Sequence, residues 1–194
     1  MLKIDKGQPW VMWPDNLVSN FIEHPANKIF DYDGNFNFTL KFSLDEEIKE
    51  RKTIISKLPT YFGVDIVPDG CRFIYRYKEA TETFYLYEEC TWEKDTIYTL
   101  VIKKIGKKLT VKINDRIFFD FELVYPLGSD DNSHIIFGAG NFPKNGFNLN
   151  YLGFTLHYLS ITRDDKLISE HKFETFIFDK SFDSSENCNF LHKI

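Results

Sequence analysis

The sequence predicts an all-β protein in which two antiparallel sheets pack as a β-sandwich or jelly roll. Residues 36 to 44 alternate apolar and polar side chains, which is the period of a strand with one buried face. Residues 97 to 123 contain three short strand patterns separated by turn signals at Gly106 and at Asn114 with Asp115. The composition agrees, because 20 Phe and 10 Tyr among 194 residues favour strands and supply a large core.

The first residues are expected to form an irregular arm, since Trp10 and Trp13 are spaced among prolines that disfavour a helix. These two aromatic side chains need cover. They either pack across the domain's own sheet edge or form an interface with another subunit. The expected division of the chain is an N-terminal arm at residues 1 to 26, a jelly-roll domain at residues 27 to 178 and a C-terminal tail at residues 179 to 194.

The strands of the domain follow one another with short connections. In the first, alternate side chains form one apolar face: Phe36, Phe38, Leu40, Phe42 and Leu44. Further strands are expected at residues 53 to 57, 61 to 67, 133 to 138 and 151 to 162, and residues 166 to 178 close the domain. Turn residues between these patterns predict a sandwich rather than parallel strands with helical connections.

The segment from residue 97 to residue 104 begins with apolar side chains on both of its faces, which predicts cover on both sides of that strand. The following turn, Lys104 to Lys107, is expected to hold its lysines in water. Leu109, Val111 and Ile113 then form the apolar face of the return strand. The lysines around this turn either protect the hairpin from edge pairing or form a phosphate-binding patch.

Residues 71 to 78 and 83 to 89 indicate a hairpin rich in aromatic side chains. Sugars stack on aromatic rings and accept hydrogen bonds from amide and guanidinium groups, so this hairpin and a later Asn-rich loop are a candidate glycan platform. Packing in the core explains part of the same aromatic set. The candidate ligand-binding residues are Arg72, Tyr75, Tyr77, Tyr85, Tyr87, Trp92, Asn141 and Asn145.

Charge and targeting signals narrow the classes of partner. A formal net charge of -5 gives no case for binding a nucleic-acid backbone, which needs a clustered cationic face. The N-terminal residues contain no apolar run typical of a signal peptide, and no later run approaches the about 20 residues of a membrane span. We therefore expect no membrane insertion and synthesis in the cytoplasm, with the final location open and delivery to a virion or cell surface as one route. Cys71, Cys90 and Cys188 are too scattered to predict a disulfide scaffold.

Acidic residues do not complete a known catalytic pattern. Glycosidases need an acid and a nucleophile flanking the scissile bond, and Glu93 with Asp95 lacks a third acid at the next position. Asp120 and Glu122 share one face of a strand, which is typical of a solvated surface. The sequence therefore predicts no catalytic residue.

Two acidic loops are candidates for a metal site, since calcium prefers several oxygen ligands. Asp31 and Asp33 lie in one of these loops, and Asp130 and Asp131 lie in the other. Turn formation and solvation are the better account of each loop. The sequence therefore predicts no cofactor, with calcium as the alternative.

Seven strand-like segments lie between about residues 30 and 175. They are Phe36-Asn-Phe-Thr-Leu-Lys-Phe, Thr53-Ile-Ile-Ser-Lys, Gly70-Cys-Arg-Phe-Ile-Tyr, Tyr98-Thr-Leu-Val-Ile after Trp92, Leu109-Thr-Val-Lys-Ile-Asn-Asp, His134-Ile-Ile-Phe-Gly and Leu152-Gly-Phe-Thr-Leu-His-Tyr-Leu-Ser-Ile. Together they resemble the laminin-G-like branch of the concanavalin A-like lectin and glucanase superfamily. Arg116 departs from the pattern of that branch, because the family often has Gly in that turn.

The resemblance implies two curved antiparallel sheets, often with a glycan, protein or calcium site on the rim loops or the concave face. The leading hypothesis is a non-catalytic recognition module that binds glycan through an aromatic face and rim loops. A second hypothesis is a structural or receptor-binding protein of a virion or other surface assembly, which would form oligomers. A polysaccharide-active enzyme ranks third.

Overall fold

The structure is a computed structural model, and the chain is described over ten ranges that contain the strands of two sheets. These are residues 1–4, 10–14, 34–57, 62–77, 83–127, 135–138, 152–173, 176–177, 180–181 and 189–193. No helix in these ranges is long and apolar enough to cross a membrane.

One sheet has seven strands in the order β1-β12-β3-β8-β9-β10, with β13 also paired to β12. Its strands are β1 (Leu2–Ile4), β3 (Phe36–Leu44), β8 (Ile97–Ile105), β9 (Lys108–Ile113), β10 (Arg116–Glu122), β12 (Phe154–Arg163) and β13 (Lys166–His171). Every pairing in it is antiparallel. A strand from late in the chain completes this sheet, since β12 pairs with the early strand β3.

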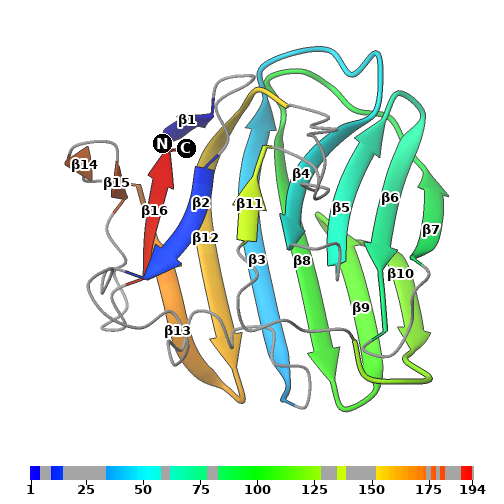
Figure 1. Cartoon of the computed structure of the whole chain (residues 1–194). Helices are drawn as coiled ribbons and strands as arrows, with labels where there is room; N and C mark the ends of the chain where they lie inside the picture. Colours follow the sequence, from blue (N-terminus) through cyan, green and yellow to red (C-terminus); the bar gives the residue numbers. More distant parts are fainter. Residues whose placement is uncertain are drawn as a thin grey trace, which may run out of the picture.

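The other sheet has nine strands in the order β14-β15-β16-β2-β11-β4-β5-β6-β7, and it lies in front of the seven-stranded sheet in Figure 1. Its strands are β2 (Trp10–Pro14), β4 (Lys52–Lys57), β5 (Phe62–Val67), β6 (Gly70–Tyr75), β7 (Phe84–Glu89), β11 (Ile135–Phe137), β14 (Phe176–Ile177), β15 (Lys180–Ser181) and β16 (Asn189–Lys193). The all-β fold with two antiparallel sheets is therefore confirmed.

The core lies between the sheets and is formed by the apolar side chains that alternate along the inward face of each strand. Rings from opposite sheets meet there: Phe38 of β3 stacks on Phe137 of β11 with centroids 6.4 Å apart, and Phe73 of β6 lies 6.3 Å from Phe119 of β10. The predicted apolar face of β3 is confirmed, since none of its five side chains is more than 4% exposed. Burial of this continuous apolar surface is the main stabilising contribution to the fold.

Segments at both ends of the chain belong to the two sheets. Strand β1 pairs with β12, and β2 lies between β11 and β16. Irregular backbone throughout the first 26 residues is therefore a wrong prediction for Leu2–Ile4 and Trp10–Pro14. Strand β16 likewise gives the expected tail a place in the nine-stranded sheet. The division at residues 26 and 178 stays a prediction.

Strand β8 has cover on one face, not two as its sequence predicts. Leu100 and Ile102 are fully buried, whereas Ile97 is 57% exposed and Val101 is half-buried on the opposite face. The apolar side chains on the outward face of β8 are tolerated because polar outward side chains of the neighbouring strands β3 and β9 surround them. Apolar side chains at the start of both faces of β8 therefore did not mean that both faces are covered.

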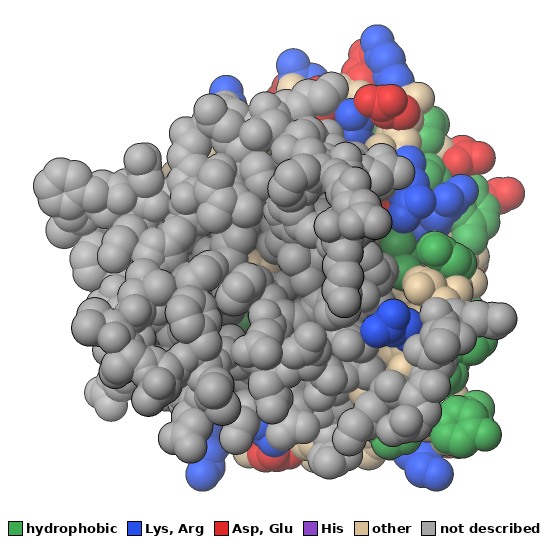
Figure 2. Space-filling view, in the orientation of Figure 1, with side chains coloured by type: hydrophobic (Ala, Val, Ile, Leu, Met, Phe, Trp, Pro, Cys, Tyr) green, Lys and Arg blue, Asp and Glu red, His purple; other side chains and the backbone are tan. Residues whose placement is uncertain are grey.

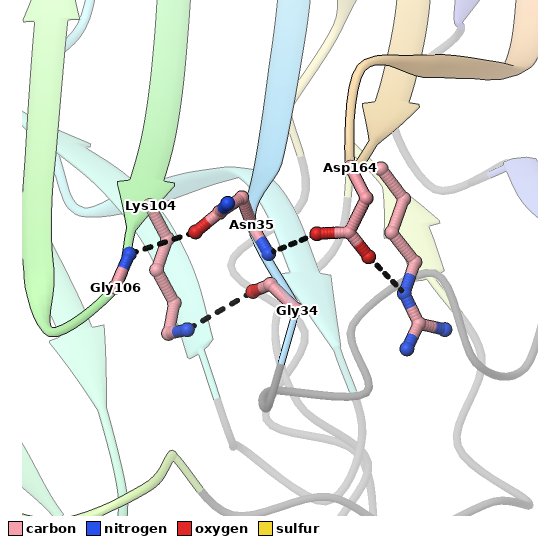
Figure 3. Close-up of polar contacts among 6 residues, drawn as sticks. Gly34, Asn35, Lys104, Gly106 and Asp164 are labelled. Atoms are coloured by element: carbon pink, nitrogen blue, oxygen red, sulfur yellow. Dashed lines mark hydrogen bonds and ion pairs between the residues drawn. The ribbon is translucent and has the colours of Figure 1, made fainter.

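The turn after β8 holds one lysine out of water, contrary to the sequence prediction. Lys104 is 4% exposed, and its Nζ donates to the carbonyl oxygen of Gly34 at 3.0 Å. The backbone N–H of Gly106 donates to Asn35 Oδ1 at 2.7 Å, and Asn35 N donates to Asp164 Oδ1 at 2.9 Å (Figure 3). These bonds join the chain just before β3 to the β8–β9 and β12–β13 turns.

Candidate functional site

The β6–β7 hairpin presents its aromatic side chains on two different faces. Cys71, Phe73 and Tyr75 point into the core, so Arg72 between them points outward. In the hairpin register Tyr87 lies opposite Arg72 and Tyr85 lies opposite Ile74. Tyr85 and Tyr87 therefore share the outer face with Arg72, whereas Tyr75 lies on the inner face opposite Phe84.

The ring of Tyr87 lies directly over Gly70. A Cβ on Gly70 would come within 2.5 Å of Tyr87 Cε2 and 2.8 Å of its Cζ, so the missing side chain makes room for the ring. The Tyr87 hydroxyl donates to the carbonyl oxygen of Asp69 at 3.1 Å. The ring is thus held against the backbone at Asp69 and Gly70, while 45% of the residue stays exposed.

Tyr85 continues this surface along β7. It is two residues from Tyr87 on the same side of the strand, about 7 Å away along the backbone, and it is 59% exposed. We call Arg72, Tyr85 and Tyr87 the tyrosine platform. Figure 2 shows hydrophobic side chains beside Lys and Arg side chains over this part of the nine-stranded sheet.

A buried carboxylate lies beside the platform, on the same face of the sheet as Arg72. Asp65 is 1% exposed, lies opposite Arg72 in the β5–β6 register, and accepts hydrogen bonds from Arg51 Nε at 2.5 Å and Thr53 Oγ1 at 2.7 Å. Burial raises the pKa of Asp65, and the bonds from Thr53 and Arg51 and the nearby charge of Arg72 reduce that rise. Arg72 thus lies between a buried carboxylate and the exposed ring of Tyr87.

Tyr75 and Tyr77 belong to a cluster of rings that closes the edge of the sandwich. Tyr75 stacks on Phe84 with centroids 5.4 Å apart and lies 5.3 Å from Phe121, while Tyr77 contacts Tyr125 at 5.6 Å. Burial and the hydrogen bond with Tyr77 raise the pKa of Tyr75 to about 12. These two tyrosines lie apart from the platform because strand pairing puts them on the opposite face.

Trp92 is fixed by packing and by its indole nitrogen. Its Nε1 donates to the carbonyl oxygen of Gly70 at 2.8 Å, and its ring meets Tyr98 edge-on with centroids 5.0 Å apart. It also lines a hollow of about 500 Å³ together with Arg116 and Phe118. The backbone of Gly70 is therefore held by Trp92, while the Tyr87 ring lies over the same residue.

A second concave surface lies on the outer face of the seven-stranded sheet. It encloses about 1260 Å³ and is formed by the outward side chains of β3, β8, β9 and β10 with the nearby turns. We call it the lysine hollow. Its lining residues are Asn37, Lys41, Thr99, Val101, Lys103, Ile105, Lys108, Thr110, Lys112, Asn114, Asp115, Ile117, Asp120, Thr162 and Asp165.

The sequence patterns did not group the residues of the lysine hollow. Alternation did assign Lys41 to the polar face of its strand, and the apolar face of β9 left Lys112 on the opposite side. Alternation was the only sequence feature that placed these lysines on the outer face. It did not indicate a site, since most antiparallel sheets have one polar face. Pairing of β3, β8 and β9 is what places these lysines beside one another.

The acidic residues considered for catalysis lie in separate places. Asp95 is in the turn before β8 at φ 62°, and Glu93 accepts a hydrogen bond from Thr96 there. Asp120 forms an ion pair with Lys108 at 2.9 Å and accepts a hydrogen bond from Thr110 at 2.8 Å. Glu93 and Asp95 therefore sit on a turn and do not flank a site from a sheet face.

Several predicted residues lie outside the part of the chain that the structure describes, and their roles stay predictions. For Trp10 and Trp13 the strand β2 is described but not the side chains, so the interface prediction also stays open. Cys71 and Cys90 are free thiols. The undescribed candidates are Asp31, Asp33, Asp130 and Asp131 for calcium and Asn141 and Asn145 for the ligand.

Solved binding domains of botulinum neurotoxins have the same sandwich. The binding domain of botulinum neurotoxin DC solved with rat synaptotagmin II matches with a TM-score of 0.53 and 10% identity over 79% of this chain and 36% of that one. The same binding domain solved with SialylT matches with a TM-score of 0.52 and 11% identity over 79% and 35% of the two chains. A botulinum neurotoxin type C structure, reported for cell entry that depends on two ganglioside molecules, matches with a TM-score of 0.50 and 9% identity over 66% and 32%.

These comparisons show the fold. The chain has the two-sheet, concanavalin A-like sandwich of those binding domains and spans about a third of their length. No protein-family model matches the sequence, and no curated protein matches it either.

Proposed function

We propose that this chain is a non-catalytic recognition module that binds carbohydrate on the tyrosine platform. The observation that carries the proposal is the Tyr87 ring packed over Gly70 while 45% of the residue stays exposed. Tyr85 adds a second exposed ring on the same face of β7.

The platform combines the two kinds of contact that sugars use. Aromatic faces stack on the apolar C–H face of a pyranose ring, and a guanidinium donates hydrogen bonds to its hydroxyl groups. Arg72 lies directly opposite Tyr87, so one saccharide unit on that ring is within reach of its guanidinium. Preorganisation favours binding, because the Tyr87 ring is already fixed before a ligand arrives.

The botulinum neurotoxin comparisons support recognition as the class of function. The matched binding domain of botulinum neurotoxin DC was solved once with SialylT and once with rat synaptotagmin II. Because this chain matches about a third of each neighbour, a glycan or protein ligand for it is our proposal. The laminin-G-like branch within the concanavalin A-like fold is part of the same proposal.

A glycan array probed with the full chain tests this function. We expect saturable binding to a set of neutral or mixed oligosaccharides, with at least tenfold weaker affinity for Tyr85→Ala and Tyr87→Ala. Tyr125→Ala is the matched control, since it removes a tyrosine that is 64% exposed away from the platform. An array on which the folded wild-type chain binds no sugar would contradict the proposal.

An assembly role is the alternative proposal, with Trp10 and Trp13 as its candidate interface. Light scattering separates the two readings: stable oligomers that disappear in the Trp10→Ala/Trp13→Ala variant would favour assembly. A polysaccharide-active enzyme ranks below both, because Glu93 and Asp95 lie on a turn.

A further inference from the structure

We infer that the lysine hollow is a second binding site, distinct from the tyrosine platform, and that it takes an acidic saccharide bearing carboxylate or sulfate groups. The hollow lies on the outer face of the seven-stranded sheet, whereas the platform lies on the outer face of the nine-stranded sheet. This inference does not depend on the proposed function.

Three lysines of the hollow surround one residue, Val101. Lys112 lies directly opposite it on β9, and Lys103 follows it by two residues on the same face of β8. Lys41 is diagonal to it on β3, because Thr39 is the residue opposite Val101. All three lysines line the hollow, and diagonal neighbours in a sheet are about 7 to 8 Å apart, so one extended ligand can span these positions.

The acidic residues of the hollow do not pair with these three lysines. Within the described ranges, neither the Lys103 nor the Lys112 side chain forms a hydrogen bond or ion pair, and Lys41 Nζ lies 6.0 Å from the Tyr158 ring centroid. The Asp120 carboxylate is held by Lys108 and Thr110. The hydrogen bond from Lys108 is the main cause of its lowered pKa, and the more distant charge of Lys112 contributes less.

Asp115 and Asp165 lie in turns at the rim of the hollow. The three lysines on adjacent strands repel one another, and an anionic ligand between them relieves that repulsion.

Neutral polar groups around the lysines suit a saccharide. Asn114 accepts a hydrogen bond from Thr99 N at 2.8 Å through its Oδ1, which leaves its amide N–H groups as donors. Asn37 and Thr162 lie opposite each other on β3 and β12 and add further amide and hydroxyl groups. Such groups hydrogen-bond sugar hydroxyls, while the lysines bind the acidic groups.

The size and lining of the hollow favour an oligosaccharide over a small anion or a nucleic acid. At about 1260 Å³ it exceeds the about 300 to 1,000 Å³ of most small-molecule pockets, which suits several linked sugar units. Its lining, as far as the chain is described, contains no aromatic ring on which bases would stack. The formal net charge of -5 also opposes long-range attraction of a nucleic acid.

Titration calorimetry on the full chain tests the inference with four probes of similar length: a sulfated oligosaccharide, an oligogalacturonate, a neutral dextran oligomer and a single-stranded oligonucleotide. We expect at least one acidic saccharide to bind at least tenfold more tightly than the dextran and the oligonucleotide. The affinity should fall as ionic strength rises from about 0.1 M to about 1 M, where the Debye length shrinks from about 10 Å to about 3 Å.

Charge-matched variants locate the site. Lys103→Gln/Lys112→Gln should weaken acidic-saccharide binding about tenfold, whereas Lys94→Gln/Lys107→Gln, with the same charge change on exposed lysines outside the hollow, should change it less than twofold. Unchanged melting temperatures establish that all variants fold.

Three results would overturn the inference: equal loss in both double variants, no binding of either acidic saccharide, or oligonucleotide binding as tight as saccharide binding. Tyr85→Ala/Tyr87→Ala separates the two proposals, since it should abolish platform binding and leave acidic-saccharide binding intact.

Discussion

Gly70 lies under the ring of Tyr87, and the two residues come from neighbouring strands whose register puts Gly70 opposite Glu89. The same glycine accepts the indole hydrogen bond of Trp92 through its carbonyl oxygen. The residue Gly70 therefore supports the Tyr87 ring on its outer face, and its carbonyl oxygen holds the half-buried Trp92.

Gly70→Ala should destabilise the protein by about 1 to 3 kcal/mol, because the added methyl group overpacks the site. Its Cβ would come within 2.5 Å of Tyr87 Cε2 and 2.6 Å of the carbonyl oxygen of Glu88. Chemical denaturation measures the loss. Part of the destabilisation should remain in Gly70→Ala/Tyr87→Ala, since the added methyl group still meets the backbone carbonyl oxygen of Glu88. If this double variant is as stable as Tyr87→Ala alone, the overpacking explanation is wrong.

Trp92→Phe should cost about 1 kcal/mol of stability and leave glycan affinity on the platform within twofold of the wild type. The variant keeps an aromatic ring beside Tyr98 but loses the 2.8 Å bond to the Gly70 carbonyl oxygen. Thermal denaturation and array binding report the two effects. A large loss of affinity in a stable variant would instead restore Trp92 as a ligand-binding residue, the role that the sequence predicted.

Lys104→Met should cost about 1.5 to 3 kcal/mol, because the lysine is buried and its Nζ donates to the Gly34 carbonyl oxygen. The nearby, exposed Lys107 is the control, and Lys107→Met should change the free energy of unfolding by less than about 0.5 kcal/mol. Urea denaturation of both variants checks the difference. Equal effects would show that the Lys104 bond contributes little to stability.

Asp65 should make stability fall as pH rises above its usual pKa. Its folded-state pKa is raised from 3.8, so between 3.8 and the folded value the native state binds more protons than the unfolded state, and unfolding becomes easier with rising pH. Asp65→Asn should remove this negative slope from a plot of unfolding free energy against pH.

Asp120 provides a control of opposite sign for that experiment. Its pKa is lowered, chiefly by the hydrogen bond from Lys108, so its contribution to stability is present above pH 3.8 and is lost as pH falls through the folded pKa. Asp120→Asn should therefore reduce the loss of stability on acidification. Relative to the wild type, the two substitutions should change the slope of unfolding free energy against pH in opposite directions. A change in the same direction would contradict the raised pKa of Asp65.

Local pattern predicted much of the fold. The alternation in β3 correctly assigned five buried side chains to one face, and the turn signals at Gly106 and Asn114 correctly bounded β9. Local pattern failed for Lys104, because its burial depends on a carbonyl oxygen 70 residues earlier in the chain. It also failed for the outward face of β8, where apolar residues at Ile97 and Val101 suggested a second layer of cover.

The candidate site was predicted only in part. Arg72, Tyr85 and Tyr87 do share one face, but Tyr75 and Tyr77, from the same predicted hairpin, lie on the other side of the sheet. The length of the connection between the two strands did not predict which residues pair across the hairpin. A shift of one residue moves every side chain of a strand to the opposite face, so the composition of the hairpin alone left the platform undetermined.

The sequence by itself determined that the chain forms antiparallel strands and which side chains of each strand point the same way, because the side-chain period of a strand is two residues. The tertiary structure alone decided which strands are neighbours. Lys41, Lys103 and Lys112 meet because β3 and β9 both pair with β8, and Tyr87 covers Gly70 because of the β6–β7 register. Both arrangements depend on pairing between separate strands, and local alternation carries no information about that pairing.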